Sequence, residues 1–352
     1  MAASLRVGIV GAGANTRARH VPGLRAIEGV EIVSVANRTL ASSRRAAQEL
    51  GIPTAYANWL DLVEADNVDA IVIGTWPYMH APVTLAALAN GKHVLCEARM
   101  AMNAAEAHQM LAQSRSRPDL VAQVVPAPFT LGVDAYVERL LADGYLGEVL
   151  AAEVTVTSGD ALDEEAPLTW RQDADLSGQN VLTMGIWYEC LMRWVGPAAR
   201  VMSTARVAVP WRRDADDRRR AVTVPDHIDI LADLACGAAA NLRFSAVTGL
   251  RPRSDVCLFV SRGTLRFDGL TGTLYGGRLA DASLAELPIP PELRGGWRVE
   301  EEFVNAIRGL EPVRLTRFED GVRYMEFTEA AMHSARTGQA VSLPLASAPF
   351  ML

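Results

Sequence analysis

The chain has 352 residues, of which 50% are hydrophobic and 21% are charged, and its formal net charge is −7. This composition is typical of a globular protein, and the length, about twice that of an ordinary domain, predicts two domains. The acidic balance argues against nucleic-acid binding, and no apolar run approaches the roughly 20 residues that would span a bilayer. The start of the chain runs into strand-like sequence without the layout of a signal peptide. We therefore expect a cytoplasmic protein with no nucleic-acid or membrane partner.

Residues 5–120 alternate short apolar strands with amphipathic helices. Strands are expected at residues 6–10, 31–36, 70–74, 93–96 and 120–124. Helices are expected between them at residues 40–50, 59–64, 79–90 and 104–114. This alternation is typical of an α/β domain whose parallel sheet is covered by helices on both faces. We place that domain at residues 1–124.

The stretch 7–16, VGIVGAGANT, places a strand before Gly11 and Gly13 and helical sequence after them. The two glycines permit a tight turn and a close approach of the backbone to a pyrophosphate, whose charge is met by N–H groups at the helix start. Asn15 and Thr16 belong to the predicted contact set, although the full pattern would have Gly or Ala in place of Thr16. Because the motif opens an alternating array, we predict a dinucleotide-binding Rossmann domain in preference to a structural turn.

The end of the second strand indicates which dinucleotide is preferred. An acidic residue here would accept hydrogen bonds from the adenosine ribose and select NAD, but the chain has Asn37, Arg38 and Thr39. Asn37 removes a charge that would repel a 2′-phosphate, and Arg38 offers a guanidinium that could bind one. This favours NADP, and stacking of Arg38 on the adenine of NAD is the alternative interpretation.

The alternation changes after about residue 125. Helices are expected at residues 133–142, 178–194, 297–309 and 319–336. Strands are expected at residues 148–157, 200–209, 227–234, 239–246, 255–261 and 263–267. Gly, Asn and Asp separate these strands closely, which favours a mostly antiparallel sheet. We therefore predict a second α/β domain at 125–352, in which the mixed-charge run 211–220 is a solvated loop.

The cysteines and the single lysine limit the available chemistry. Cys96, Cys190, Cys236 and Cys257 lie far apart in apolar surroundings and lack zinc-ligand spacing, which predicts free thiols and no metal site. Lys92 is the only lysine in the chain. Any mechanism that needs a lysine must therefore use Lys92 or do without one.

Several stretches, in order along nearly the whole chain, match one known family. They read VGIVGAGANTRARHVPGL, VSVANRT, DAIVIGTWPYMHAPVTLAALANGKHVLCE, YLGEV, TWR and GIWYECLMRWVG. Together they resemble the glucose–fructose oxidoreductase and inositol dehydrogenase group, the Gfo/Idh/MocA family. The resemblance implies a Rossmann domain, an α/β domain with an open-faced sheet, a bound NAD(P), a sugar-like substrate, and a homodimer or homotetramer associated through that sheet. The cofactor-lining residues that it implies are Thr75, Trp76, Pro77, His80 and Glu97, with Trp170 and Arg171 from the second domain.

The chain departs from that family at both motifs that handle protons. Family members have Glu-Lys-Pro where this chain has Glu97-Ala98-Arg99, so an alanine replaces the lysine that would exchange a proton with the reacting oxygen. The family pattern Asp-x-Gly-x-His-x-x-Asp falls on residues 183–190, TMGIWYEC, where only the glycine is kept. Lys92 precedes the strand that ends before Ala98, which is too far away to replace the lysine. Arginine is a poor proton donor.

The remaining candidates for proton transfer are Tyr188, Glu189 and His227. A tyrosine near Arg99 could have a lowered pKa and act as an acid or base, although packing between the domains is an equally good interpretation. His227 opens a strand and titrates in a useful range, although a histidine there is more often structural.

The predicted substrate contacts combine charged, polar and aromatic groups. Asn180, Thr183 and Trp187 are spaced to share one face of a helix. Trp187 could be a stacking platform for a sugar or a residue of the core. The full predicted set is Arg99, Arg171, Asn180, Thr183 and Trp187.

These residues are compatible with three functions. We favour an NAD(P)-dependent oxidoreductase that acts on a sugar, a polyol or a related hydroxyl or carbonyl compound. The second is an NAD-dependent glycosidase or lyase that oxidises its substrate transiently, eliminates the aglycone and reduces the product, with Arg99 and Arg171 favouring an anionic glycoside. The third is a non-catalytic, dinucleotide-binding regulatory protein, which would explain the missing proton carriers.

Overall fold

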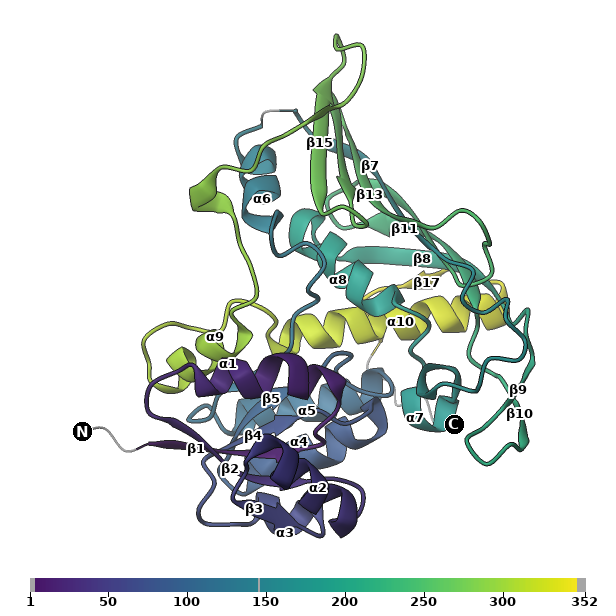
Figure 1. Ribbon diagram of the computed structural model, residues 1–352. Helices are drawn as coiled ribbons and strands as arrows, with labels where there is room; N and C mark the ends of the chain where they lie inside the picture. The colour runs from purple at the N-terminus through teal and green to yellow at the C-terminus, as the bar shows by residue number, and fades with distance from the viewer. Residues whose placement is uncertain (1–3, 145, 347–352) are drawn as a thin grey trace. The chain divides into compact units, whose positions relative to one another are not determined.

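The computed structural model describes residues 4–144 and 146–346. The chain divides into two compact units (Figure 1). Residues up to Pro126 form the first together with Arg298–Val322, and Ala127–Trp297 form the second together with the residues from Arg323 onward. The first break lies close to the predicted boundary at 124/125. Residues 298–322 differ from the prediction, because they were assigned to the second domain and belong to the first unit.

A parallel sheet of six strands, in the order β3-β2-β1-β4-β5-β6, forms the centre of the first unit. Its strands are β1 (Leu5–Val10), β2 (Val30–Ala36), β3 (Thr54–Tyr56), β4 (Ala70–Ile73), β5 (His93–Cys96) and β6 (Ala122–Val124). All four residues of β4 are buried, as expected of a strand covered on both faces. The predicted parallel Rossmann sheet is therefore confirmed, and β3 is a strand that the sequence analysis did not identify.

The strand order of this sheet fixes where a ligand can bind. The order reverses between β1 and β4, and ligands of such sheets bind at the carboxyl ends of the strands on either side of the reversal. The helical segments of the unit are η1 (Thr16–His20), α1 (Val21–Arg25), α2 (Leu40–Leu50), α3 (Trp59–Val63), η2 (Pro77–Met79), α4 (His80–Ala89), α5 (Ala104–Ser116) and α9 (Val299–Ile307).

The second unit contains a sheet of nine strands in the order β16-β15-β14-β13-β7-β12-β11-β8-β17. Within the described residues, the pair β7–β12 is parallel and the other pairs are antiparallel, so the predicted mostly antiparallel sheet is confirmed. The strands are β7 (Val149–Thr157), β8 (Ala198–Arg206), β11 (His227–Leu234), β12 (Ala239–Ser245), β13 (Arg253–Val260), β14 (Gly263–Asp268), β15 (Thr273–Arg278), β16 (Ala285–Glu286) and β17 (Val341–Ser342).

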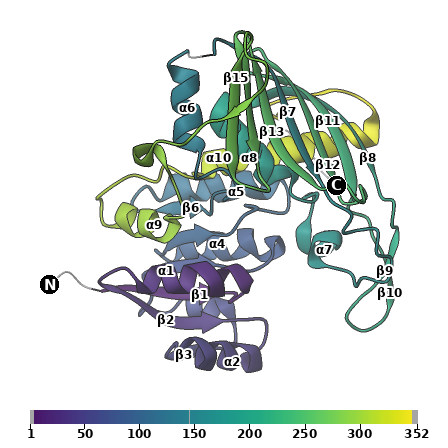
Figure 2. The ribbon, with the colours of Figure 1, turned by 45° about the horizontal axis from the view of Figure 1, so that its top comes forward.

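Helices cover one face of this sheet (Figure 2). Ser203 of β8 is hydrogen-bonded to Ser334 and to the carbonyl of Ala331, both on α10. Met202 of β8 pairs with Leu231 of β11, and both side chains lie on the face opposite to that of Ser203. They are 48% and 60% exposed. Because side chains alternate along a strand, one face is buried under helices and the other is open. The helical segments are α6 (Asp134–Ala142), η3 (Trp170–Gln172), α7 (Ala174–Ser177), α8 (Met184–Val195), η4 (Pro291–Leu293) and α10 (Phe318–Thr337), whose first residues belong to the first unit.

The mixed-charge run that was expected to be a solvated loop forms a hairpin of β9 (Trp211–Arg213) and β10 (Arg219–Ala221). Most of its side chains are exposed. Arg212 is an exception at 3% exposure, and its guanidinium donates hydrogen bonds to the carbonyls of Ala161, Asp163 and Ala166. Arg212 therefore stabilises the loop at residues 161–166 through hydrogen bonds to its backbone.

The remaining composition-based expectations concern thiols, metals and membranes. Cys96 and Cys190 are buried free thiols, Cys257 is partly exposed, and Cys236 is exposed. Across residues 4–144 and 146–346, no cluster of three His, Cys, Asp or Glu side chains could hold a metal ion. Over the same residues, no helix has both the length and the apolar character needed to cross a membrane.

Candidate functional site

The glycine turn follows β1 at the point where the strand order reverses. Gly11 has φ +89°, and a Cβ built on it would lie 2.7 Å from the backbone nitrogen of Thr75 and 2.8 Å from the carbonyl carbon of Gly74. A Cβ on Gly13 would lie 3.1 Å from the oxygen of Gly74. Only glycine fits at Gly11 without moving β4, which is the physical reason for the motif.

Thr16 explains how the chain tolerates its departure from the glycine pattern. The side chain is 1% exposed, and its hydroxyl donates to the carbonyl of Gly11 at 3.2 Å. A Cβ on Gly74 would collide with this hydroxyl. The space for the Thr16 side chain is therefore provided by a glycine in the facing loop, Gly74, instead of by a glycine at residue 16. As a correction to the predicted cofactor contact, Thr16 supports the turn from behind.

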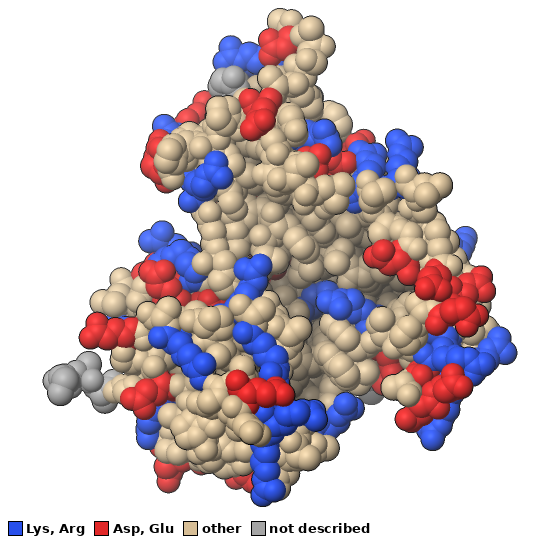
Figure 3. Space-filling view, in the orientation of Figure 1, with Lys and Arg blue, Asp and Glu red and all other residues tan. Residues whose placement is uncertain are grey.

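A cavity of about 630 Å³ lies beside the turn, at the carboxyl ends of β1, β2 and β4. Of the predicted cofactor residues, it is lined by Gly11, Gly13, Asn37, Arg38, Thr75 and Trp76. The sequence analysis missed other lining residues, including Ser42, Asn58, Trp59, Tyr78 and Met79. Asn58 and Trp59 follow β3, so identifying that short strand would have pointed to them. On the face that Figure 3 shows, basic side chains gather over this unit near α2.

The end of β2 carries no carboxylate into this cavity. The Oδ1 atom of Asn37 accepts a hydrogen bond from the backbone N–H of Ala12 at 2.8 Å, and its Nδ2 donates to the carbonyl of Ser42 at 3.1 Å. Asn37 therefore joins the glycine turn to α2. The exposed guanidinium of Arg38 lies 5.8 Å from the centre of a Trp76 ring.

Three other predicted cofactor residues have structural contacts. Thr39 is the N-cap of α2, where its hydroxyl accepts from the backbone N–H of Ser42. His80 is fully buried, with Nδ1 2.8 Å from the carbonyl of Arg99 and Nε2 3.1 Å from that of Thr75, and burial lowers its pKa. Pro77 is buried at the start of η2. Thr39, Pro77 and His80 thus stabilise the loops around the cavity, and their contact with the cofactor stays a prediction.

Glu97 directly follows β5, the second strand from the reversal in strand order. Its carboxylate accepts hydrogen bonds from Asn15 and from the backbone N–H of Ala98, and it lies 3.0 Å from Nε2 of His20. Burial alone would raise the pKa of Glu97, but His20 and Asn15 lower it. Glu97 is thus an ionised, fixed carboxylate, and Asn15 reaches it rather than lining the cavity.

Two basic residues lie on either side of β5, Lys92 before the strand and Arg99 after it. Arg99 is 2% exposed, which leaves little of its side chain able to reach a substrate. Lys92 is 8% exposed at the start of β5, and its Nζ donates to the carbonyls of Ala65 and Val68 at 2.9 and 2.7 Å. The inference that Lys92 cannot replace the family lysine is therefore confirmed.

Tyr188 is a residue of the core, which corrects its predicted role in proton transfer. It is 1% exposed and stacks on Phe327 with ring centres 3.6 Å apart. Its hydroxyl accepts a hydrogen bond from the backbone N–H of Ala198 at 2.7 Å, and burial raises its pKa. The expected lowering of this pKa is wrong.

Replacing Tyr188 with phenylalanine tests this assignment. We expect Tyr188→Phe to lower the free energy of unfolding by about 1–3 kcal/mol, because the buried N–H of Ala198 loses its acceptor. Urea denaturation measures this, with Tyr136→Phe at a half-buried position of α6 as the control. If the variant kept its stability and instead shifted the pH dependence of turnover, Tyr188 would be a proton carrier after all.

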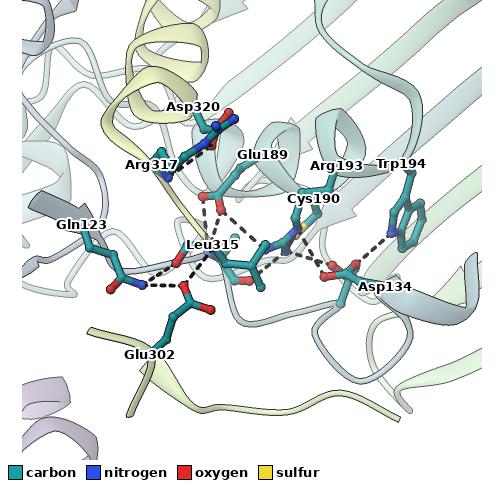
Figure 4. Close-up of polar contacts among 12 residues, drawn as sticks. Gln123, Asp134, Glu189, Cys190, Arg193, Trp194, Glu302, Leu315, Arg317 and Asp320 are labelled. Atoms are coloured by element: carbon teal, nitrogen blue, oxygen red, sulfur yellow. Dashed lines mark hydrogen bonds and ion pairs between the residues drawn. The ribbon is translucent and has the colours of Figure 1, made fainter. Parts of the chain in front are cut away.

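Glu189 belongs to a buried ion cluster in the second unit (Figure 4). It is 1% exposed and accepts hydrogen bonds from the backbone N–H of Ala127 at 3.2 and 3.3 Å. Arg193 lies between Glu189 and Asp134, with ion-pair distances of 3.5 and 3.3 Å. As a correction, Glu189 is a counter-ion inside the unit and not a proton carrier at a site.

Burial at the start of α8 divides the predicted substrate residues into buried and accessible ones. Trp187 is 2% exposed and stacks on Phe129 at 4.5 Å, so core packing is the correct one of its two interpretations. Asn180 is fully buried and donates to the carbonyl of Ser177. Thr183 and Ile186 are half-buried, so they form the accessible side of the chain at the start of α8. As corrections, Asn180 and Trp187 are structural, whereas Thr183 stays available.

His227 lies on the open face of the sheet. Its Nε2 is 3.0 Å from Asp229, and both side chains alternate with the buried Ile228 and Ile230. Since α8 and α10 cover the opposite face, a proton on His227 cannot reach a ligand beside α8. The predicted catalytic role of His227 is therefore corrected to an open-face ion pair.

The segment Trp170-Arg171 forms the short helix η3. The guanidinium of Arg171 lies 4.2 Å from the centre of a Trp170 ring, and its pKa is lowered by burial. The hydroxyl of Ser177 donates to the carbonyl of Arg171 at 3.4 Å. These contacts hold the pair in a defined conformation, and their contact with cofactor or substrate stays a prediction.

The fold and the site together define an NAD(P)-binding oxidoreductase of the Rossmann class. Residues 5–124 match the family described as "Oxidoreductase family, NAD-binding Rossmann fold", and residues 135–280 match the "GFO/IDH/MocA C-terminal domain". The chain belongs to the Gfo/Idh/MocA family, as its sequence motifs indicated.

Relatives extend over nearly the full length. The chain is 29% identical to dTDP-3,4-didehydro-2,6-dideoxy-alpha-D-glucose 3-reductase of Streptomyces antibioticus over 94% of this chain and 97% of that protein. The fold is similar to that of levoglucosan dehydrogenase in complex with NADH and levoglucosan, at 20% identity, a TM-score of 0.87, and coverage of 97% and 100%. A 3-ketoreductase from Actinomadura kijaniata in complex with NADP gives 21% identity, a TM-score of 0.75, and coverage of 94% and 98%.

Proposed function

We propose that this protein transfers a hydride between NAD(P) and a sugar, a polyol or a related hydroxyl or carbonyl compound. The observation that carries the proposal is the glycine turn with its adjoining cavity, at the point of the sheet where dinucleotides bind. The sugar-like substrate rests on the names of the relatives, which act on deoxysugar nucleotides and an anhydrosugar. The cofactor would supply the hydride donor and acceptor.

The chain would handle protons differently from the family pattern. Ala98 stands in place of the lysine, and Tyr188, Glu189 and His227 each have the structural contacts described above. We infer that Arg171 or the Thr183 hydroxyl orients the reacting oxygen, and that the proton exchanges with water. An arginine can polarise a carbonyl without giving up its own proton.

A panel of sugars, polyols and ketones tests this function. We expect a change in nicotinamide absorbance with a substrate of this class. Cleavage of a glycoside that requires bound NAD but yields no net NADH would instead support the oxidation–elimination–reduction enzyme. Tight binding of the dinucleotide without turnover of any compound would support a regulatory protein.

We also propose a preference for NADP, because Arg38 is exposed at the edge of the cavity and none of the described residues that line the cavity is an aspartate or a glutamate. The change Arg38→Ser is expected to weaken NADPH binding about tenfold or more, the loss of one charge-assisted hydrogen bond, and to change NADH binding less than about threefold. Calorimetry measures both, with Arg44→Ser, an exposed arginine of α2, as the control. Equal weakening of NADH and NADPH would favour the stacking interpretation.

The predicted homodimer or homotetramer belongs to the same proposal. Met202 and Leu231 leave apolar surface on the open face of the second unit's sheet. Association through that face would bury it, as apolar patches at subunit interfaces do.

A further inference from the structure

Three segments of the first unit that are far apart in sequence meet at one buried imidazole. His20, in η1, is fully buried. Its Nδ1 lies 2.5 Å from Oε1 of Glu300, and its Nε2 lies 3.0 Å from Oε1 of Glu97. Glu300 is 3% exposed in the first turn of α9, within the segment 298–322 that joins this unit from late in the sequence.

The backbone around Glu300 is shaped to admit its carboxylate. A Cβ built on Gly23 would lie 2.8 Å from both Cδ and Oε2 of Glu300. Any larger residue at this position of α1 would push the carboxylate away from His20. The contact is therefore built into two helices and is not an accident of one flexible side chain.

The π-helical turn of η1 explains how one carboxylate receives two side chains from the same helix. Asn15 and His20 are five residues apart, and both contact Oε1 of Glu97. In an α-helix, residues five apart point about 140° away from each other. Hydrogen bonding from i to i+5 in a π-turn brings such residues close to one face, and the N–H of Val21 donates to Thr16 in this pattern.

The charges of the cluster leave an excess of negative charge. Burial alone would lower the pKa of His20, but its hydrogen bonds to Glu300 and Glu97 raise it to about 9, so the imidazole is cationic at neutral pH. Two carboxylates thus face one imidazolium. Among the described residues, His80 and Cys96 also interact electrostatically with Glu97. Burial lowers the pKa of His80 and raises that of Cys96, so neither group adds a charge at neutral pH. Asn15 is neutral.

The topology places this cluster on the nicotinamide side of the proposed site. Asn37 and Arg38 follow β2, on the side of the strand-order reversal that takes the adenosine half of a dinucleotide. Glu97 follows β5, on the other side of the reversal. The oxidised nicotinamide ring carries a positive charge, and the reduced ring is neutral.

We propose that Glu300 is a positioning residue that, through His20, holds Glu97 ionised and immobile beside the nicotinamide and makes the site prefer the oxidised over the reduced dinucleotide. This inference rests on the proposed function, because it requires NAD(P) at the carboxyl ends of the sheet. Helix α9, from the carboxy-terminal part of the sequence, would thus help to set the reduction potential of the bound dinucleotide.

The test compares the dissociation constants of oxidised and reduced dinucleotide in the full-length chain. Glu300→Gln removes one negative charge and keeps the side-chain shape. At a pH where NMR shows the His20 imidazole to be protonated in both chains, we expect the ratio Kd(NADPH)/Kd(NADP⁺) to fall about threefold to tenfold, as a charge of this kind acting across a partly polar interior would produce. We also expect the His20 imidazole, followed by NMR, to lose its proton at a lower pH than in the unchanged chain.

Glu302→Gln is the matched control. Glu302 lies on the same helix, is 4% exposed and accepts a hydrogen bond from Gln123 (Figure 4). It also accepts from the backbone N–H groups of Arg314 and Leu315, and so has other partners than Glu300. This control is expected to cost stability without changing the ratio. Glu300→Asp keeps the charge and should keep the ratio within about twofold.

A second measurement needs no variant. In the unchanged chain, the ratio should rise as the pH passes through about 9, because loss of the His20 proton adds one more negative charge to the cluster. A flat ratio across that range, or equal weakening of both dinucleotide forms in Glu300→Gln, would overturn the inference. Failure of the unchanged chain to bind either form would instead reject the proposed function itself.

Discussion

Replacing Arg193 with methionine is expected to lower the free energy of unfolding by about 3–5 kcal/mol, the cost of breaking a buried ion network by removing one partner. The guanidinium is 8% exposed, and it donates to the carbonyl of Ala127 at 2.9 Å and the hydroxyl of Thr130 at 3.1 Å. Glu189 and Asp134 would remain buried without their counter-ion. Burial alone would lower the pKa of Arg193, but Cys190, Glu189 and Asp134 raise it, so the charge is firmly held.

Chemical denaturation followed by tryptophan fluorescence measures this loss. Trp194 is a suitable reporter, because its Nε1 donates to Asp134 at 2.8 Å. The matched control is Arg200→Met, which removes an ion pair between Arg200 and Asp233. The side chain of Arg200 is 60% exposed. Exposed pairs contribute about 0–1 kcal/mol. A similar small loss in both variants would show that the buried network does not stabilise the unit.

Replacing Gly13 with valine is expected to weaken the binding of both oxidised and reduced dinucleotide by about 100-fold or more. Gly13 is exposed to the cavity, and the first added carbon would already lie 3.1 Å from the oxygen of Gly74. The further methyl groups would occupy the place of the pyrophosphate and block the N–H groups that bind it. Unlike Gly11, Gly13 has no positive φ that would strain the folded state.

Calorimetry with NAD(H) and NADP(H) checks this result, and circular dichroism verifies that the variant is folded. Gly132→Val is the control, because a Cβ at that position would meet nothing within 4 Å. Unchanged affinity in Gly13→Val would remove the glycine turn from the binding site and reject the assignment of the cavity.

The parts of the site that sequence reasoning identified are those with a local pattern. Gly11, Gly13, Asn37, Arg38, Thr75 and Trp76 line the cavity, and their contact with the cofactor stays a prediction. Each follows directly from a strand whose end is visible in the sequence. Thr16 and Thr39 come from the same motifs, but their short side chains turn back to the backbone, which a residue pattern does not reveal.

The residues of the second unit were harder to assign, because the face that a residue presents depends on what packs against its element. The predicted face of α8 contained Trp187, but the accessible face contains the preceding residue, Ile186, together with Thr183. Trp187 itself is buried. His227 was the best titrating candidate by residue type. Its place on the open side of β11 became clear only from the strand's pairing and the helices on the other face.

The sequence by itself determined the fold class, the glycine turn and the family, because each depends on neighbours within a short segment. The tertiary structure alone decided that 298–322 completes the first unit, that Glu300 reaches His20 across 280 positions, and that Arg193 forms ion pairs with two buried carboxylates. Such contacts leave no periodic signal in the sequence. They arise because burying a charge is favourable only where the folded chain brings an opposite charge to it.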